Sequence, residues 1–558
     1  MDANAPLPIL GLSIGIVGHR PVRIVDPVRV RSRIVEVLDA ADAEMTRLAA
    51  GGRWSGRQPL VLVSALAEGA DRLAAAAALD AGMALGAVLP FPPDEYARDF
   101  ATAEAREEFR SLLARASTRL TLAGASDARE RAYDAAGMAL LDNCDLLLAV
   151  WDGEGGRGRG GTREVIEEAA RRAMPVIVIA PDGGTVTIRA AGAGDAMRFE
   201  DLPERPLERL AETIEALVSL DGGPDAEEWR ALGTRLPTSF FHGAYPLMLR
   251  LVGALPWRGR KPAAPGPQDA PRGALAAAFA WWDGSAIRAA QAFRSAVIVN
   301  FALAALAVVL AATSILAGHA KWLFVIAEIA TILLLLANAW RARRRRWQQR
   351  WLGSREVAEL LRVSMLLRQV GIGRGWPGSV GGGHVGRYAA ALARVQEPLF
   401  LDLADGVAAD ALVAEVAGQA AWNEATSRRL HLAAHRIQRF GEVLFVIVLA
   451  AAVLWLGVFA ASPDGAYALS APLVAITAGL PAIATASYGI RIILDLEGIS
   501  SRTQRIAERL QALLARWETG PRTASALQGF ARRASDIMLA DVAAWRLLAE
   551  GRRLTIPG

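Results

Sequence analysis

Cysteine, metal-ligand motifs and standard nucleotide motifs are scarce in this chain. Its 558 residues include one cysteine, Cys144, and six histidines. A single thiol cannot form an internal disulfide, and the histidines lack a metal-ligand spacing such as HExxH. We therefore expect no disulfide framework, no metal site and no bound cofactor. The P-loop pattern GxxxxGK[ST] is missing, and no GxGxxG follows the first apolar run, so a P-loop ATPase is not supported.

A cleavable signal peptide is also missing. The first ten residues have no basic region, and the first apolar run ends at Gly18-His19-Arg20 rather than at a small-residue cleavage site. We expect the N-terminal region to stay in the cytoplasm.

Apolar residues, by contrast, are abundant. They make up 53% of the chain, and four runs reach the ~20 residues needed to cross a bilayer. The runs form two closely spaced pairs and predict four transmembrane helices in two hairpins, with spans at residues 296–316, 322–340, 443–461 and 469–490.

Basic residues indicate the orientation of these spans. Arginines flank the outer ends of both pairs, including the cluster at 341–346, whereas the two short connectors carry one lysine between them. The positive-inside rule then predicts a multi-pass protein of the cytoplasmic (inner) membrane, with the N- and C-termini and the middle segment in the cytoplasm. The basic cluster is better explained by this membrane contact than by nucleic acid, and we expect no direct nucleic-acid binding.

Three residues within the spans are candidates for a role in the membrane: Asn300, Glu328 and Pro481. A carboxylate such as Glu328 is costly in hydrocarbon and is a functional candidate by default. A protonated or water-reached Glu328 near the outer interface is the open alternative. Pro481 frees a backbone carbonyl and is expected to kink its helix.

The remaining sequence divides into segments of different character. A Pro/Gly-rich stretch at 256–273 is expected to be a linker between an N-terminal domain, 1–255, and the membrane half. The first hairpin with its cytosolic helix covers 274–371, a connecting segment covers 372–440, and the second hairpin with its cytosolic helices covers 441–558. Similar motifs after the second and fourth spans suggest a divergent repeat.

The N-terminal domain, with a core at 8–182, alternates short apolar runs with helical patterns. This alternation predicts an α/β, doubly wound, Rossmann-like parallel sheet. The expected strands are residues 12–17, 60–63, 85–89, 120–123, 145–151 and 176–179.

Ligands bind such sheets at the carboxyl ends of the strands, so the residues after three strands form the candidate ligand site. Glycines there admit a ligand to the backbone, Arg20 offers a fork for phosphate, and a glycine-rich loop leads into a helix N-terminus that favours anions. The candidate ligand residues are Gly18, His19, Arg20, Ser64, Glu68, Gly69, Asp71, Asp152, Gly160, Gly161, Thr162 and Glu164. The pattern predicts a phosphate-bearing ligand, and a nucleotide in particular. For each residue taken singly, turn chemistry or helix capping is an equal explanation.

Residues 14–20, 64–72, 145–153 and 160–164 together resemble the SLOG superfamily, which includes cytokinin-activating phosphoribohydrolases and the sensor domain of TRPM channels. The membrane half is similar to SLATT modules, on the basis of Trp351, residues 358–362 and residues 419–422. The resemblance implies a cytosolic sensor of a nucleotide second messenger, such as a cyclic nucleotide or an ADP-ribose derivative, coupled to a membrane-perturbing or pore-forming effector in bacterial defence. We also expect a homo-oligomer in the lipid bilayer.

Two alternatives stay open. Enzymatic relatives carry an acid three residues after the threonine of PGGxGTxxE, whereas Glu164 follows Thr162 by two, a displacement of about 100° on a helix. A membrane-anchored phosphoribohydrolase acting on nucleoside monophosphates, with Glu164 as the catalytic acid, is therefore the weaker hypothesis. A scaffold that binds no small molecule is the third.

Overall fold

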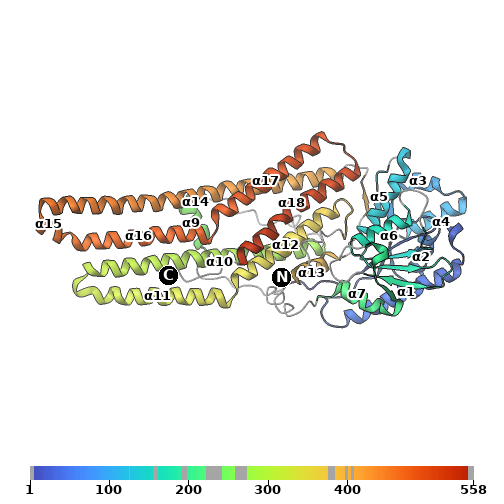
Figure 1. Ribbon diagram of the computed structural model, residues 1–558, viewed down its shortest axis with the longest axis horizontal. Coiled ribbons are helices and arrows are strands. Elements are labelled where there is room, and N and C mark those ends of the chain that lie inside the picture. Colours follow the sequence, from blue (N-terminus) through green and yellow to red (C-terminus); the bar gives the residue numbers. More distant parts are fainter. Residues whose placement is uncertain are drawn as a thin grey trace.

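The computed structural model is elongated, with a sheet domain at one end and a long helical half at the other (Figure 1). The structure describes residues 5–124, 126–154, 161–190, 198–220, 242–257, 273–374, 384–395, 397, 400–403 and 407–550. Most of the expected linker, at 258–272, lies outside the described residues.

The N-terminal domain is built on a mostly parallel sheet, as the alternating pattern predicts. Its strand order is β8-β7-β6-β5-β1-β2-β3-β4-β9, with β7 and β8 antiparallel to their neighbours. The six expected strands are present within two residues of their expected ends, whereas β7, β8 and β9 were not expected. The strands are β1 (Ser13–Gly18), β2 (Val61–Ser64), β3 (Ala84–Leu89), β4 (Thr118–Thr121), β5 (Leu146–Val150), β6 (Val176–Ile179), β7 (Val186–Arg189), β8 (Glu204–Pro206) and β9 (Phe400–Asp402).

Helices cover both faces of this sheet, because alternate strand residues point to opposite faces. In β5, Leu146, Leu148 and Val150 join one buried cluster, while Leu147 and Ala149 join the other. The first face is covered by α1 (Pro27–Ala49), α2 (Ala70–Asp80), α4 (Ala103–Ala114) and α7 (Leu210–Val218), and the second by α5 (Arg129–Leu141) and α6 (Thr162–Arg171). Short helical segments are α3 (Pro93–Tyr96) and 3₁₀ turns at Pro21–Arg23, Ala97–Asp99, Ser126–Ala128, Phe199–Asp201 and Leu207–Arg209.

The C-terminal half is helical and repeats one arrangement twice. In the first copy, α10 (Ala274–Thr313) and α11 (Lys321–Arg344) form a hairpin, and α12 (Trp347–Arg368) packs back along α10. In the second, α14 (Val407–Ala461), α15 (Pro463–Ala468) and α16 (Ser470–Ile493) form the hairpin, and α17 (Leu496–Thr519) packs back along α14. Also present are α9 (Ala244–Leu251), α13 (His384–Ala393), α18 (Ala524–Glu550) and 3₁₀ turns at Ser314–Leu316 and Gly318–Ala320.

Equivalent backbone breaks separate the spans from the helices that follow them. Arg346, between α11 and α12, has φ +48°, and Asp495, between α16 and α17, has φ +51°. Left-handed non-glycine residues are uncommon, and their occurrence at matching positions strengthens the expected repeat.

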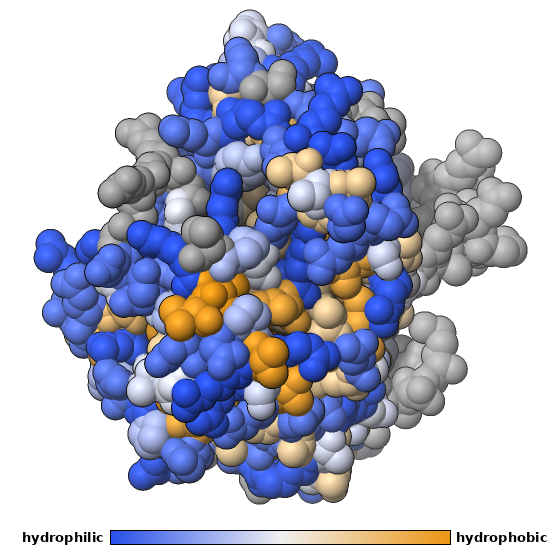
Figure 2. All heavy atoms as spheres, turned by 90° about the vertical axis from the view of Figure 1, so that its right-hand side faces the viewer, coloured by the Kyte–Doolittle hydropathy of each residue, from blue (hydrophilic) through white to orange (hydrophobic). Residues whose placement is uncertain are grey.

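All four expected spans lie in helices long and apolar enough to cross a membrane: Ala274–Leu316, Gly318–Arg368, Ala408–Ala461 and Ser470–Thr519. Large hydrophobic side chains are exposed along them, among them Ile326, Leu333, Val446 and Leu454. Among described residues 5–220, only Leu7, Val25 and Val28 are exposed in this way. Figure 2, seen from the sheet-domain end, shows a mainly hydrophilic surface with small hydrophobic areas. The exposed apolar belt identifies the helical half as the membrane part.

Ion pairs and hydrogen bonds join the helical half to the edge of the sheet where the parallel strands begin. Asp145, 5% exposed, precedes β5 and lies 3.0 Å from Arg394 Nε and 3.5 Å from Arg374 Nε. It also accepts a hydrogen bond from the Ser13 amide at the start of β1, at 2.9 Å. Strand β9, which precedes α14, pairs with β4 and completes one edge of the sheet.

Further contacts extend this junction. Asn143 donates to the Gly371 carbonyl at 2.8 Å and accepts from the Gly373 amide at 3.1 Å, and Asp142 pairs with Arg532 at 2.6 Å. Helix α9, which the sequence boundary at residue 255 assigns to the N-terminal domain, instead packs on α10. The sheet and the membrane half therefore share a polar interface that includes a buried carboxylate.

Candidate functional site

The carboxyl edge of the sheet brings together the three loops that the sequence singled out. Strands β5, β1 and β2 are neighbours, with Gly18 opposite Val150 and Ile16 opposite Ser64. The strand order turns back between β1 and β5, and such switch points are where open α/β sheets bind ligands. This edge lies at the opposite ends of the strands from the junction with the helical half.

A polar contact joins the loops after β1 and β5. His19 is 8% exposed, and its Nε2 lies 3.1 Å from the Asp152 amide nitrogen and 3.0 Å from Asp152 Oδ1. Arg23 lies 3.3 Å from the other carboxylate oxygen. Burial acts to raise the pKa of Asp152, but the Glu154 amide, His19 and Arg23 outweigh it and hold the pKa below its usual value. Asp152 is thus an anion at neutral pH, flanked by groups that fix its position.

Two predicted glycines are required by close packing of these loops. A Cβ on Gly18 would lie 2.4 Å from the Cβ of Ala70. Gly69 has φ +108°, and a Cβ there would lie 2.4 Å from the His19 carbonyl oxygen. The start of α2 therefore rests directly on the loop after β1, and glycine is needed for that approach.

Ser64 and Asp71 are buried beneath the site rather than open to it. Ser64 is fully buried and accepts from the Leu66 amide at 3.0 Å, and Asp71 is 6% exposed. Burial raises the pKa of Asp71 to about 7, although hydrogen bonds with Ala67, Ser64 and Ala65 oppose the shift. These side chains support the loop after β2, while Glu68 is half-buried and Arg20 is exposed.

The helix that follows the glycine-rich loop begins as expected. Thr162 is the first residue of α6, Gly161 is its N-cap, and Glu164 lies half-buried in the first turn. Because glycine has no side chain to cap the first amides, this helix end suits an anion. Gly160 lies outside the described residues.

A hollow of about 690 Å³ lies beside Asp152, over the ends of β5, β6 and β7. Of the predicted residues, only Asp152 lines it, so the hollow adjoins the loop after β5, and the residues predicted to share the site from the loops after β1 and β2 do not line it. Its other main side chains are Arg23, Trp151, Arg189, Phe199 and Glu204. Trp151 and Phe199 meet edge to face with ring centroids 5.6 Å apart, and Arg189 lies 5.3 Å from the centre of the Phe199 ring.

The sequence reasoning missed most of this lining. Trp151 directly follows β5, so its position was a usable signal. Arg189 ends β7 and Phe199 begins a 3₁₀ turn, and the apolar pattern predicted neither element. Aromatic rings and arginines around one hollow could hold a planar ring and an anionic group.

Two of the three predicted membrane residues have defined surroundings. Asn300 is 2% exposed, and its Oδ1 accepts from Asn338 Nδ2 at 2.7 Å, which joins α10 to α11. Glu328 is half-buried and forms no hydrogen bond or ion pair with a residue in the described part of the chain. Helix α16 continues through Pro481, and the kink stays a prediction.

Within the described residues, no group of three or more His, Cys, Asp or Glu side chains could hold a metal ion. Searches against models of known protein families and against curated proteins find no match to this chain.

Proposed function

We propose that this protein is a cytosolic sensor of a nucleotide-derived ligand that acts on the membrane through its four spans. The observation that carries the proposal is the position of β1 and β5. Each of these strands begins at the Asp145 junction with the helical half and ends at the loops carrying His19 and Asp152. At about 3.3 Å per residue, the five residues of β5 put the two ends about 17 Å apart.

Transmission requires that the ligand bind two arrangements of the protein with different affinity. A ligand in the hollow would contact the Trp151-Asp152 end of β5, and a shift of this strand would alter the Asp145 ion pairs at its other end. The resemblance to SLOG and SLATT modules supports a cyclic nucleotide or an ADP-ribose derivative as the ligand. The proposed role in bacterial defence rests on that resemblance alone, and the homo-oligomer stays a prediction.

The test uses full-length protein in dye-loaded liposomes titrated with a panel of cyclic and ADP-ribose nucleotides. We expect at least one nucleotide to bind and to change the rate of dye release. Trp151→Ala and Arg23→Gln should weaken both responses, whereas Arg110→Gln, at an exposed ion pair on α4, should leave them unchanged. Nucleotide binding without any change in release would overturn the effector role.

The phosphoribohydrolase alternative is separated by product analysis in the same samples. If free base is released from a nucleoside monophosphate and Glu164→Gln abolishes this release, the protein is a hydrolase and the sensor proposal is replaced. If no nucleotide binds at all, the scaffold alternative is favoured.

A further inference from the structure

A second cavity, of about 390 Å³, lies in the helical half between the two copies of the repeat. Its walls come from α9, α10, α12, α14, α17 and α18. The cavity is therefore separate from the hollow at the sheet edge. Five arginines line it: Arg294, Arg355, Arg362, Arg429 and Arg502.

Carboxylates neutralise three of these five arginines. Arg355 forms an ion pair with Glu359 and lies 3.3 Å from Asp283, and Arg362 lies 3.5 Å from Glu359. Arg502 lies 2.8 Å from Asp495, the residue at the left-handed break before α17. Three carboxylates against five guanidinium groups leave two positive charges in excess.

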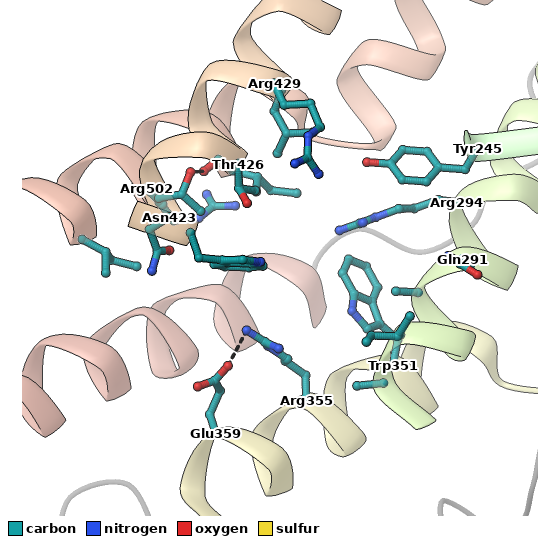
Figure 3. A pocket seen from close by; sticks show the side chains of 18 of the residues that line it. Tyr245, Gln291, Arg294, Trp351, Arg355, Glu359, Asn423, Thr426, Arg429 and Arg502 are labelled. Carbon is teal, nitrogen blue, oxygen red and sulfur yellow. Dashed lines mark hydrogen bonds and ion pairs between the residues drawn. The ribbon is translucent and has the colours of Figure 1, made fainter. Parts of the chain in front are cut away.

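The excess resides on Arg294 and Arg429. Neither forms an ion pair with a residue that the structure describes, and they come from different copies of the repeat, on α10 and α14. In Figure 3 both guanidinium groups point into the space between the helices. Arg294 is held between aromatic rings, 5.0 Å from the centre of Tyr245 and 4.8 Å from that of Trp351.

Stacking fixes the Arg294 plane while its N–H groups stay available to a ligand. Two such guanidinium groups match the charge of one phosphate monoester, about −1.5 to −2 at neutral pH. Asn423, Thr426 and Gln291 line the same cavity and add neutral hydrogen-bonding groups. Arg294 is half-buried and Arg429 is exposed, so partial burial strengthens the charge-assisted hydrogen bonds of Arg294 in particular relative to open water.

We propose that this cavity binds a phosphate-bearing anion between the two hairpins. The bound group would bridge α10 and α14 through Arg294 and Arg429, so its occupancy favours the arrangement in which the repeats lie together. The same chemistry fits a soluble phosphate compound and a phospholipid headgroup. The proposal does not depend on the nucleotide site at the sheet edge, because no residue lines both cavities.

The test measures binding of inorganic pyrophosphate and phosphate to the full chain in phosphatidylcholine nanodiscs, by isothermal titration calorimetry. Arg429→Gln and Arg294→Gln should each weaken binding at least about tenfold, through loss of a charge-assisted hydrogen bond. Arg428→Gln is the matched control, because Arg428 is exposed like its neighbour Arg429 but does not line the cavity and is paired with Glu424. Arg294→Lys retains the charge without the planar fork and should give an intermediate result.

Nanodiscs containing phosphatidic acid show whether the cavity binds a phospholipid headgroup or a soluble phosphate compound. If the lipid occupies the cavity, it should reduce pyrophosphate binding to the wild-type protein and leave the residual binding of Arg429→Gln unchanged. If pyrophosphate binds equally in both kinds of nanodisc, a soluble ligand is the natural occupant. The proposal is overturned if neither pyrophosphate nor the lipid binds, or if Arg429→Gln and Arg428→Gln behave alike. Asp152→Asn, at the sheet-edge hollow, should leave this binding unchanged, so failure of one site is not failure of the other.

Discussion

At the residue scale, the sheet-edge loops combine exposed charge with buried support. Arg20 and Asp152 face outward, while Ser64 and Asp71 lie beneath the loop after β2. A buried carboxyl is stabilised in its neutral form, so its titration links the loop to pH. Gly69, at the start of α2, sets how closely the loops after β1 and β2 approach each other. Both features give predictions.

Asp71 should make stability depend on pH. Its pKa is about 7 in the folded protein and about 3.9 when unfolded, so between these values the folded state binds the extra proton. The free energy of unfolding therefore falls as pH rises from about 4 to 7, by at most about 4 kcal/mol. Thermal unfolding of the full chain in detergent measures this dependence. Between pH 5.5 and 8, the stability of Asp71→Asn should fall less than that of the wild-type protein. Exposed Asp39→Asn is the control, and an Asp71→Asn profile parallel to wild type would contradict the prediction.

Gly69→Ala should destabilise the sheet domain by about 2 kcal/mol or more. The backbone there has φ +108°, and the new methyl would meet the His19 carbonyl oxygen. Chemical unfolding followed by circular dichroism measures the loss. Gly56→Ala, where a Cβ would meet nothing within 4 Å, should change stability by less than about 0.5 kcal/mol. Equal losses in the two variants would refute this role for Gly69.

At the element scale, each hairpin depends on contacts between helices that lipid cannot supply. Without a hydrophobic driving force between spans, small residues and hydrogen bonds hold helices together. The Asn300–Asn338 bond joins α10 to α11. In the second copy, Ser427 and Ser500, 3.2 Å apart through their hydroxyls, join α14 to α17 outside the spans and so hold the following helix rather than the hairpin itself. Polar pairs thus mark both copies of the repeat.

Asn338→Ala should weaken the first hairpin by about 0.6 to 1.7 kcal/mol, between the average and the largest value typical of hydrogen bonds between membrane helices. The measurement is unfolding of the full chain in mixed micelles of increasing SDS content. Thr331→Ala is the comparison, because Thr331 bonds only to the Ala327 carbonyl of its own helix among the described residues. In a double-mutant cycle, Asn300→Ala should add little once Asn338 is replaced, and simple additivity would exclude direct coupling.

At the scale of the whole molecule, the buried carboxylate of Asp145 is one of the groups that connect the sheet to the membrane half. Charges from Arg374 and Arg394, with the Ser13 amide, outweigh burial and hold the pKa of Asp145 below its usual value. A depressed pKa means that the contribution of Asp145 is present above about pH 4 and is lost as pH falls further. Acid should therefore weaken these ion pairs only below about pH 4, as Asp145 becomes protonated.

Asp145→Asn should cost about 3 to 5 kcal/mol, because it leaves two partly buried guanidinium groups without their shared anion. Hydrogen exchange on the full chain should show faster exchange in β9 and at the starts of β1 and β5. Asp80→Asn, which breaks an exposed ion pair with Arg31, should cost at most about 1 kcal/mol. If exchange at the junction is unchanged in Asp145→Asn, the ion pairs do not hold the halves together.

The features that rest on local patterns could be predicted from the amino-acid order alone. Apolar runs of about 20 residues require lipid or a core, so the four spans could be predicted, and alternating apolar runs and helices predicted the parallel sheet. It could also be predicted that the loops after β1, β2 and β5 lie at one edge of the sheet, because the carboxyl ends of parallel strands lie together.

Contacts between residues far apart in the sequence could not be predicted, because they depend on how the two halves of the protein pack in three dimensions. Strand β9 has three residues, too few for a periodic signal, and it joins β4 from about 280 positions away in the sequence. Asp145 had appeared as part of a strand, whereas its role depends on Arg374 and Arg394 arriving from the helical half. The cavity around Arg294 and Arg429 likewise exists only because two distant hairpins pack side by side. The charge balance of such a cavity depends on which charged residues surround it in space, and the order of residues along the chain does not give this information.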